Sequence, residues 1–114
     1  MAGEMVKYAS DFMETMKKIG EIDPNYLQAF MHLLKEAEKP GVLSTKVKEL
    51  ISVALSVSAR CTYCIAAHVK NAIDAGATRQ EIIESALVSG LMGGGPSVAY
   101  IKYVFDALDE FGAK

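Results

Sequence analysis

Residues 44–68 read STKVKELISVALSVSARCTYCIAAH, and the way this stretch folds decides the architecture. Ser44 or Thr45 fits the N-cap of a helix with helically spaced apolar residues: Val47, Leu50, Ile51, Ala54, Leu55 and Val57. A second helix is expected from about Cys61 to Asp74, with Gly76 as its stop signal. Residues 58–60 between them therefore predict a turn that folds the two segments into a central antiparallel helical hairpin.

The chain before the hairpin also has helical periodicity. Apolar residues recur at spacings of three and four from Val6 to Ile19, and Gly20 is a plausible end for that helix. Asp23 and Pro24 then fit the N-cap and the first helical position of a second helix. This helix carries an apolar stripe of Tyr26, Leu27, Phe30, Met31 and Leu34.

The chain after the hairpin continues in the same way. Residues 78–81, Thr-Arg-Gln-Glu, form a capping box that predicts a fifth helix. The Gly-Gly-Gly-Pro stretch at residues 93–96 is expected to end that helix and to open the last one. Because no alternating strand pattern occurs, residues 1–114 predict a single all-α domain of six helices.

Composition narrows the classes of function. The 114 residues carry a formal net charge of −2, so no basic field favours nucleic acid as a partner. No apolar run reaches the roughly 20 residues of a membrane span, and residues 1–7 lack the features of a signal peptide. We therefore expect a cytoplasmic protein that engages neither membrane nor nucleic acid. Residues 51–57 have little charge on any face, which predicts a helix buried nearly all round and hence a homo-oligomer.

The candidate chemistry lies in Cys61, Cys64 and His68. These are the chain's only two cysteines and one of its two histidines. Their spacings of three and four residues place all three on one face of a helix. Near a helix N-terminus the thiolate form of a cysteine is favoured, and a histidine exchanges protons near neutral pH. A close pair of thiols in a reducing compartment indicates catalysis or metal binding rather than a structural disulfide.

Glu49 joins this cluster only if the hairpin forms. In one continuous helix it would lie about 18 Å from Cys61, at 1.5 Å per residue. With a turn centred between Ser58 and Ala59, Glu49 and His68 are equally far from the turn and face each other. The hairpin thus predicts a relay of Glu49, His68 and Cys64, with Cys61 as the second thiol.

The pattern Glu-x11-Cys-x2-Cys-x3-His, formed by Glu49, Cys61, Cys64 and His68, resembles the signature of the alkylhydroperoxidase D-like branch of the carboxymuconolactone decarboxylase family. The flanking residues 46–51 and 76–82 resemble that family too, and the resemblance spans roughly residues 25–108. It implies an all-helical antioxidant fold, a trimer or hexamer, and a thiol peroxidase or disulfide reductase without cofactor or metal.

The resemblance also implies a role for each residue. Cys64 attacks the hydroperoxide and becomes a sulfenic acid, and Cys61 resolves it to an internal disulfide. Glu49 and His68 move protons, and a dithiol partner such as a lipoyl or thioredoxin-like protein regenerates the thiols. Tyr63 departs from the family pattern, because fuller-length members have a histidine between the cysteines.

Several alternatives stay open at this point. The dipole of the helix N-terminus favours Cys61 as the nucleophile, whereas the resemblance and the nearness of His68 favour Cys64. A zinc site made of the same four residues is a less favoured alternative, since ligands three and seven residues apart along one helix would need an unusual arrangement. The other functions considered are a redox-sensing or scaffold oligomer and a lactone decarboxylase of the wider family.

Overall fold

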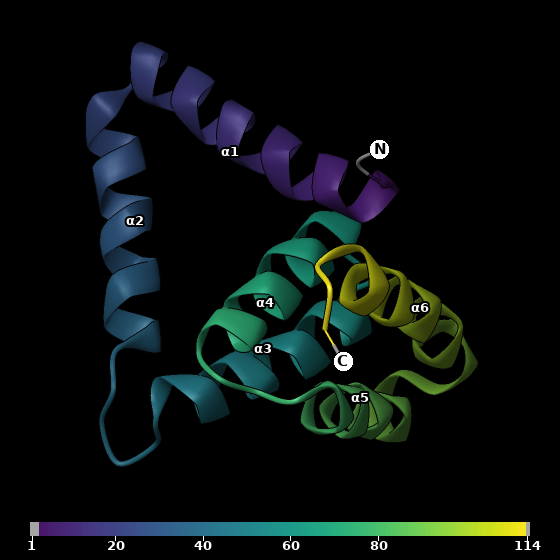
Figure 1. Cartoon of the computed structure of the whole chain (residues 1–114). Coiled ribbons are helices and arrows are strands. Elements are labelled where there is room, and N and C mark those ends of the chain that lie inside the picture. The colour runs from purple at the N-terminus through teal and green to yellow at the C-terminus, as the bar shows by residue number, and fades with distance from the viewer. Residues whose placement is uncertain (1–2, 114) are drawn as a thin grey trace.

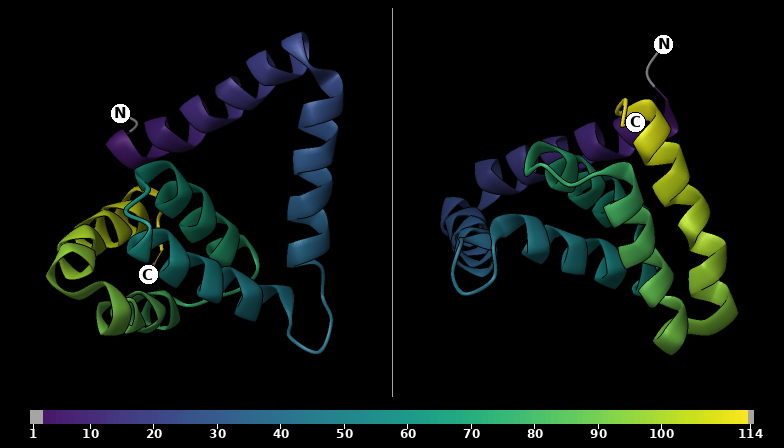
Figure 2. Two further views of the ribbon diagram at one scale, coloured as in Figure 1. Left: turned by 180° about the vertical axis from the view of Figure 1, so that it is seen from behind. Right: turned by 60° about the horizontal axis from the view of Figure 1, so that its bottom comes forward.

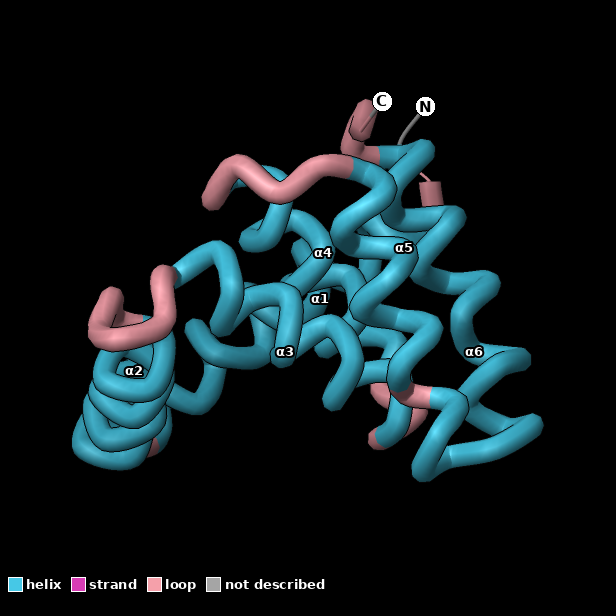
Figure 3. Tube along the Cα trace, turned by 90° about the horizontal axis from the view of Figure 1, so that it is seen from below, coloured by secondary structure: helices cyan, strands magenta, loops and turns pink. Residues whose placement is uncertain are grey.

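Six helices joined by short loops make up the part of the chain that the structure, a computed structural model, describes, residues 3–113 (Figure 1). They are α1 (Glu4–Ile22), α2 (Pro24–Glu38), α3 (Thr45–Ser58), α4 (Thr62–Asp74), α5 (Arg79–Val88) and α6 (Gly90–Glu110). No strand occurs within these residues, as the tube in Figure 3 also shows. The prediction of an all-α fold of six helices is confirmed.

Three of the helices begin where the capping residues predict. Asp23 and Ser44 are the N-caps of α2 and α3, and each side chain accepts a hydrogen bond from the backbone N–H three residues later. Ser44, rather than Thr45, is therefore the cap of α3. Thr78 and Glu81 form the complete capping box at the start of α5, each side chain bonding the other's backbone N–H.

Gly20 does not end α1, which continues to Ile22. A glycine inside a helix costs only about 1 kcal/mol relative to alanine, so neighbouring contacts can override it. Here the missing side chain lets α2 approach α1, because a methyl group at Gly20 would lie 2.6 Å from Cδ2 of Leu27. The glycine thus serves packing between the two helices rather than termination.

The glycine stretch at residues 93–96 opens the last helix but does not end α5. That helix already ends at Val88, and another helical turn precedes the break. The break itself is at Gly94, whose φ of 62° and ψ of −151° belong to a region occupied almost only by glycine. The straight part of α6 therefore begins after Gly94, which the sequence located to within a few residues.

Helices α3 and α4 form the predicted antiparallel hairpin, seen from both sides in Figures 1 and 2. The turn is closed by backbone hydrogen bonds from Arg60 N–H to the Val57 carbonyl and from Cys61 N–H to the Ser56 carbonyl. These are the two bonds of a Schellman motif, in which Arg60 takes the left-handed position with a φ of 54°. The end of α3 thereby fixes where Cys61 begins the next helix.

The hydrophobic core lies among α3, α4, α5 and α6. Its fully buried side chains come from these four helices, with Met5 of α1 added at one edge. They are Val53, Val57, Ile65, Ala66, Val69, Ala72, Ile82, Ala86, Ile101, Val104, Ala107 and Leu108. Helix α2 contributes no buried residue and stands apart from this core, at the side of the molecule in Figure 1.

Residues 51–57 are only partly buried within one chain, so the nearly complete burial expected from their composition requires a second copy and stays a prediction. Val53, Ser56 and Val57 are buried in the core, whereas Ile51 and Leu55 are 46% and 63% exposed. Within residues 3–113, no other helix covers the face that carries these two side chains. Among the described residues, none of the helices has the length and hydropathy needed to cross a membrane.

Candidate functional site

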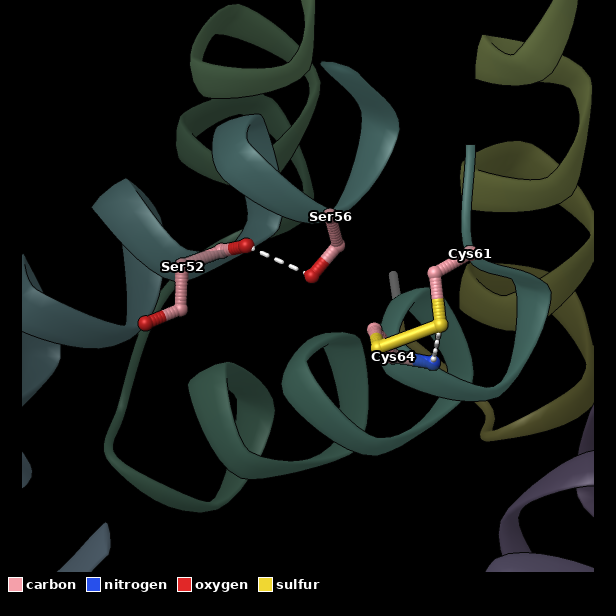
Figure 4. Close-up of a disulfide and its surroundings, with 4 residues drawn as sticks. All are labelled: Ser52, Ser56, Cys61 and Cys64. Carbon is pink, nitrogen blue, oxygen red and sulfur yellow. Dashed lines mark hydrogen bonds between the residues drawn. A yellow bond between two sulfur atoms is a disulfide. The ribbon is translucent and has the colours of Figure 1, made fainter. Parts of the chain in front are cut away.

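Cys61 and Cys64 are joined by a disulfide at the N-terminal end of α4, with Cα atoms 5.2 Å apart. Cys61 is the N-cap itself, just before the helix, and its Sγ accepts a hydrogen bond from the Cys64 N–H at 3.2 Å. Figure 4 shows Ser52 and Ser56 of α3 across from the pair, with the Ser56 hydroxyl donating to the Ser52 carbonyl. The structure is therefore that of the oxidised pair.

Glu49 and His68 lie where the hairpin register predicts. Oε2 of Glu49 is 2.8 Å from Nδ1 of His68, and the side chains are 1% and 21% exposed. Because a carboxylate can only accept, Nδ1 carries a proton and donates it to this bond. The other ring nitrogen, Nε2, is thereby left as the atom that exchanges protons with a reactant.

The two groups shift each other's protonation equilibria. Burial alone would raise the pKa of the Glu49 carboxyl, but the hydrogen bond to His68, with the nearby Glu38 and Asn71 side chains, holds that pKa below its usual value. The pKa of His68 is raised, because its hydrogen bond to Glu49 outweighs the burial that favours the neutral ring. The pair thus favours an imidazolium beside the second cysteine, a charge that stabilises a thiolate.

A cavity of about 540 Å³ leads to this pair between α4 and the two N-terminal helices. Cys64 and His68 contribute to its wall, whereas Cys61 is not among the described residues that line it. Most of the remaining wall is apolar and comes from α1 and α2: Ala9, Phe12, Met13, Met16, Phe30, Met31 and Leu34. Of the two cysteines, Cys64 is therefore the one that borders the space where a substrate can enter.

Glu38, the last residue of α2, is a member of the site that the sequence reasoning missed. Its carboxyl oxygen, a carboxyl oxygen of Glu49 and a ring nitrogen of His68 lie within 4.8 Å of one another. Hydrogen bonding to Glu49, together with burial and the Glu49 charge, raises the pKa of Glu38 to about 7. The only signal for it was its place just before the helix break at residues 39–41, which returns α2 onto the start of α3.

Three donor atoms this close could in principle hold a metal ion. The hydrogen bond between Glu49 and His68 argues against it, because a protonated Nδ1 has no lone pair for a metal. Cys61 and Cys64 are not in this group, since their sulfur atoms are bonded to each other. While Cys61 and Cys64 are joined in the disulfide, neither sulfur is available as a thiolate ligand for the zinc site considered from the sequence.

Tyr63, at the position where the family pattern has a histidine, packs against α1. Its ring meets that of Tyr8 edge to face, with centroids 5.0 Å apart. Tyr63 is 44% exposed and is not among the residues that line the cavity. Its described contacts are therefore those of packing between α1 and α4, and the hydrogen-bonded pair one turn from Cys64 consists of His68 and Glu49.

Comparisons with known proteins agree with these observations. Residues 24–107 match the carboxymuconolactone decarboxylase family. An uncharacterized protein of Cupriavidus necator is 37% identical over 94 residues, covering 80% of this chain and 83% of the relative. An uncharacterized protein from the cox locus of Paracoccus denitrificans is 34% identical over 106 residues, covering 93% of this chain and 92% of the relative.

Solved structures resemble the whole fold. A carboxymuconolactone decarboxylase family protein of Legionella pneumophila superposes with a TM-score of 0.90 at 33% identity, over 95% of this chain and 96% of that one. A family protein of Thermotoga maritima, for which a role in an antioxidative response has been suggested, gives a TM-score of 0.81 at 25% identity. It covers 93% of this chain and 90% of that one.

Proposed function

Because the chain belongs to the carboxymuconolactone decarboxylase family and forms a Cys61–Cys64 disulfide beside a Glu49–His68 pair, we propose that it is a thiol-dependent oxidoreductase that reduces hydroperoxides. The observation that carries the proposal is the position of Cys64. Its sulfur belongs to a redox pair, lines the cavity and lies one helical turn from His68. A nucleophile, its partner thiol and a proton donor thus meet at one entrance.

The reduced pair has the groups that each step requires. The Cys64 thiol gives its proton to Nε2 of His68, and the thiolate attacks the outer oxygen of the hydroperoxide. The O–O bond breaks, Cys64 becomes a sulfenic acid, and the departing alkoxide takes the proton from His68. The Cys61 thiol then attacks the sulfenic sulfur, which forms the disulfide and releases water. A dithiol returns two electrons and two protons to restore both thiols.

The wall of the cavity supports an organic substrate. Its apolar side chains from α1 and α2 suit an alkyl or aryl group better than they suit a small hydrated peroxide. The role suggested for the Thermotoga maritima relative is of the same class. For regeneration we propose a dithiol such as a lipoyl or thioredoxin-like protein, because one dithiol reduces a disulfide without leaving a mixed disulfide on the enzyme.

The proposal predicts a stoichiometric change of redox state. One equivalent of cumene hydroperoxide added to the reduced protein is expected to remove both thiols and to form one intramolecular Cys61–Cys64 disulfide. Dihydrolipoamide is then expected to restore both thiols and to support repeated turnover. Thiol counting and mass spectrometry of the intact chain follow the first reaction, and loss of hydroperoxide follows the second.

Each alternative function gives a different result in the same assay. Oxidation of the pair without repeated turnover would indicate a redox sensor or scaffold. Decarboxylation of a carboxylactone by protein with both thiols blocked would indicate the wider family's chemistry, in which Cys61 and Cys64 are dispensable. Persistence of both thiols after excess hydroperoxide would contradict the peroxidase proposal.

We further propose that the chain assembles with copies of itself into a trimer or hexamer. The outer face of α3 exposes Ile51 and Leu55, and the junction of α5 and α6 exposes Leu91 and Met92 by 84% and 93%. Uncovered apolar side chains this numerous mark contact surfaces rather than free surface. Near the same junction of α5 and α6, Leu87, Val88 and Val98 are also exposed.

Light scattering during size-exclusion chromatography tests this assembly. The expected mass is three or six times the 12.3 kDa of the chain. Leu55→Glu is expected to lower it, since a charge in an apolar interface is costly, whereas Val42→Glu on the loop before α3 leaves it unchanged. A mass of one chain for the unmodified protein at tens of micromolar would contradict the proposal.

A further inference from the structure

One oxygen of the buried Glu49 carboxylate has no hydrogen bond from the described residues. Oε2 accepts from His68, but Oε1 is buried without a donor. Leaving a buried charged oxygen unpaired costs more than leaving a neutral one, and native structures rarely do so. An unrecognised donor for Oε1 is therefore expected close to it.

The Asn71 amide lies on the same cavity wall and also acts on the Glu49 carboxyl. Glu38 is the neighbouring group that can share a proton with it. It approaches from the end of α2, and its carboxyl oxygen lies within 4.8 Å of the Glu49 and His68 atoms. Two carboxylates this close repel each other, whereas one carboxylic acid and one carboxylate share a proton in a strong hydrogen bond. We propose that Glu38 is a positioning acid of the relay, which shares a proton with Glu49 and thereby sets the proton affinity of His68.

The chain of contacts runs through three helices. Glu38 of α2 acts on Glu49 of α3, which acts on His68 of α4, the group that serves Cys64. The effect of Glu38 on Cys64 is indirect: it passes through Glu49 and through the charge that Glu38 places near His68. A role of this shared proton in the reduction of peroxides rests on the proposed function. The existence of the shared proton does not depend on that function.

The surroundings of Glu38 connect it to solvent. It lines both the cavity at Cys64 and a second, more open one of about 360 Å³. Thr45, Glu49, Asn71, Asp74 and Ala75 form the rest of the second wall. Protons can thus reach the Glu38 carboxyl from outside while the substrate occupies the larger cavity.

Three other charged side chains line the two cavities: Asp74, Lys70 and Lys35. Asp74 of α4 is paired with Lys70 at 2.6 Å. Lys70 and Lys35 also contribute to the wall of the larger cavity, at the ends of long side chains. By contrast, one titratable atom each of Glu38, Glu49 and His68 lies within 4.8 Å of the other two. Each of these three groups therefore has a strong effect on the pKa of the others.

The direction of the pKa shifts agrees with this geometry. The pKa of Glu38 is raised to about 7 chiefly by its hydrogen bond to Glu49. Once ionised, Glu38 adds a negative charge that raises the pKa of His68 further. Above neutral pH the relay is therefore expected to hold the proton on His68 more strongly than Glu49 alone would.

Nuclear magnetic resonance of the oxidised protein tests the shared proton without any turnover. In the unmodified chain the His68 ring signals are expected to show two inflections with pH, one of them near 7 from Glu38. Glu38→Gln keeps a donor for Glu49 but cannot ionise. It should remove the inflection near 7 and lower the pKa of His68 by about one unit.

Two controls come from the chain itself. Glu36→Gln changes an exposed glutamate two residues away on the same helix, and should leave the His68 titration unchanged. Glu38→Ala, which removes both the donor and the charge, should differ from Glu38→Gln by a lower melting temperature, because Oε1 then stays unpaired.

Some results would overturn the proposal. One is a His68 titration with a single inflection that Glu38→Gln leaves unchanged. Another is stoichiometric binding of Zn²⁺ to the oxidised chain that Glu38→Gln abolishes, which would make the three side chains a metal site. Both are read without hydroperoxide, so they are independent of whether the peroxidase proposal holds.

The rate of thiol oxidation tests whether Glu38 also affects the proposed reaction. Below pH 6, where Glu38 is protonated, Glu38→Gln and the unmodified protein should react at rates within about twofold. Above the pKa of His68 the variant should react up to about tenfold more slowly, because a pKa lower by one unit leaves tenfold less imidazolium. Equal rates across the whole pH range would contradict a role in the reaction.

Discussion

Replacing Cys64 by serine is expected to lower hydroperoxide turnover at least about a thousandfold, to the level of the uncatalysed reaction. A hydroxyl is a far weaker nucleophile than a thiolate at neutral pH, and Cys64 is the only cysteine among the described residues that line the cavity. The measurement is consumption of cumene hydroperoxide with dihydrolipoamide as reductant. The fold should persist, since cysteine and serine have nearly the same size and Cys64 is only partly buried.

Cys61→Ser is the matched control, since it removes the partner thiol and keeps the proposed nucleophile. It should react once with hydroperoxide and stop at a sulfenic acid on Cys64, detectable with a dimedone probe. Normal turnover by Cys64→Ser, or a sulfenic acid trapped on Cys61 in that variant, would reverse the assignment. The position of Cys61 at the helix N-terminus makes that reversal the physically meaningful competitor.

Glu49→Gln is expected to slow oxidation of the Cys64 thiol by about a hundredfold, within the range of general acid–base effects. The amide keeps the shape of the carboxyl but loses the charge that holds His68 protonated. The pKa of His68 should therefore fall, and with it the imidazolium that stabilises the thiolate. Stopped-flow measurement of thiol oxidation and the His68 titration report the two effects separately.

The same variant should lose stability over a defined range of pH. A lowered carboxyl pKa stabilises the fold above the unfolded value of about 4.5 and loses this effect as the pH falls through the folded pKa. A raised histidine pKa stabilises the fold below about 6.5 and loses this effect as the pH rises through the folded pKa. The free energy of unfolding lost in Glu49→Gln should thus be largest between about pH 4.5 and pH 6.5, where it is about 2 kcal/mol, the value of a hydrogen bond to a charged group.

Urea unfolding at several pH values measures that loss. Glu84→Gln, on the exposed face of α5, is the control and should change the free energy of unfolding by less than about 0.5 kcal/mol. A Glu49→Gln protein with unchanged His68 pKa and unchanged oxidation rate would show that the hydrogen bond is only structural. A slower rate with an unchanged pKa would place Glu49 outside the proton relay.

The helices and the register of the hairpin could be predicted because their determinants are local. Caps at Asp23, Ser44 and Thr78 mark helix starts by short-range hydrogen bonds, and a turn near residues 58–60 sets which residues face each other. Glu49 and His68 follow from that turn by simple counting. The residue spacing along the α3–α4 hairpin was therefore enough to predict the Glu49–His68 pair.

The remaining features depend on contacts between segments whose relative placement no spacing rule fixes. Glu38 enters the site from α2, and its distance from Glu49 depends on the path of the loop at residues 39–44. Gly20 looked like a helix end but allows close approach by Leu27, a tertiary contact. Gly94, not the start of the glycine run, holds the backbone break of α6.

Cys61 belongs to two helix ends at once, and this has a consequence for the energetics of each catalytic cycle. Its backbone N–H terminates α3 through the Ser56 carbonyl, while its carbonyl accepts from Ile65 N–H and its side chain begins α4. Neither backbone bond depends on the state of the sulfur atom. The main chain can therefore stay in place when the disulfide opens, so the reorganisation energy of switching between dithiol and disulfide falls mainly on side-chain rotation. Such an arrangement suits the repeated oxidation and reduction that the proposed peroxidase cycle requires.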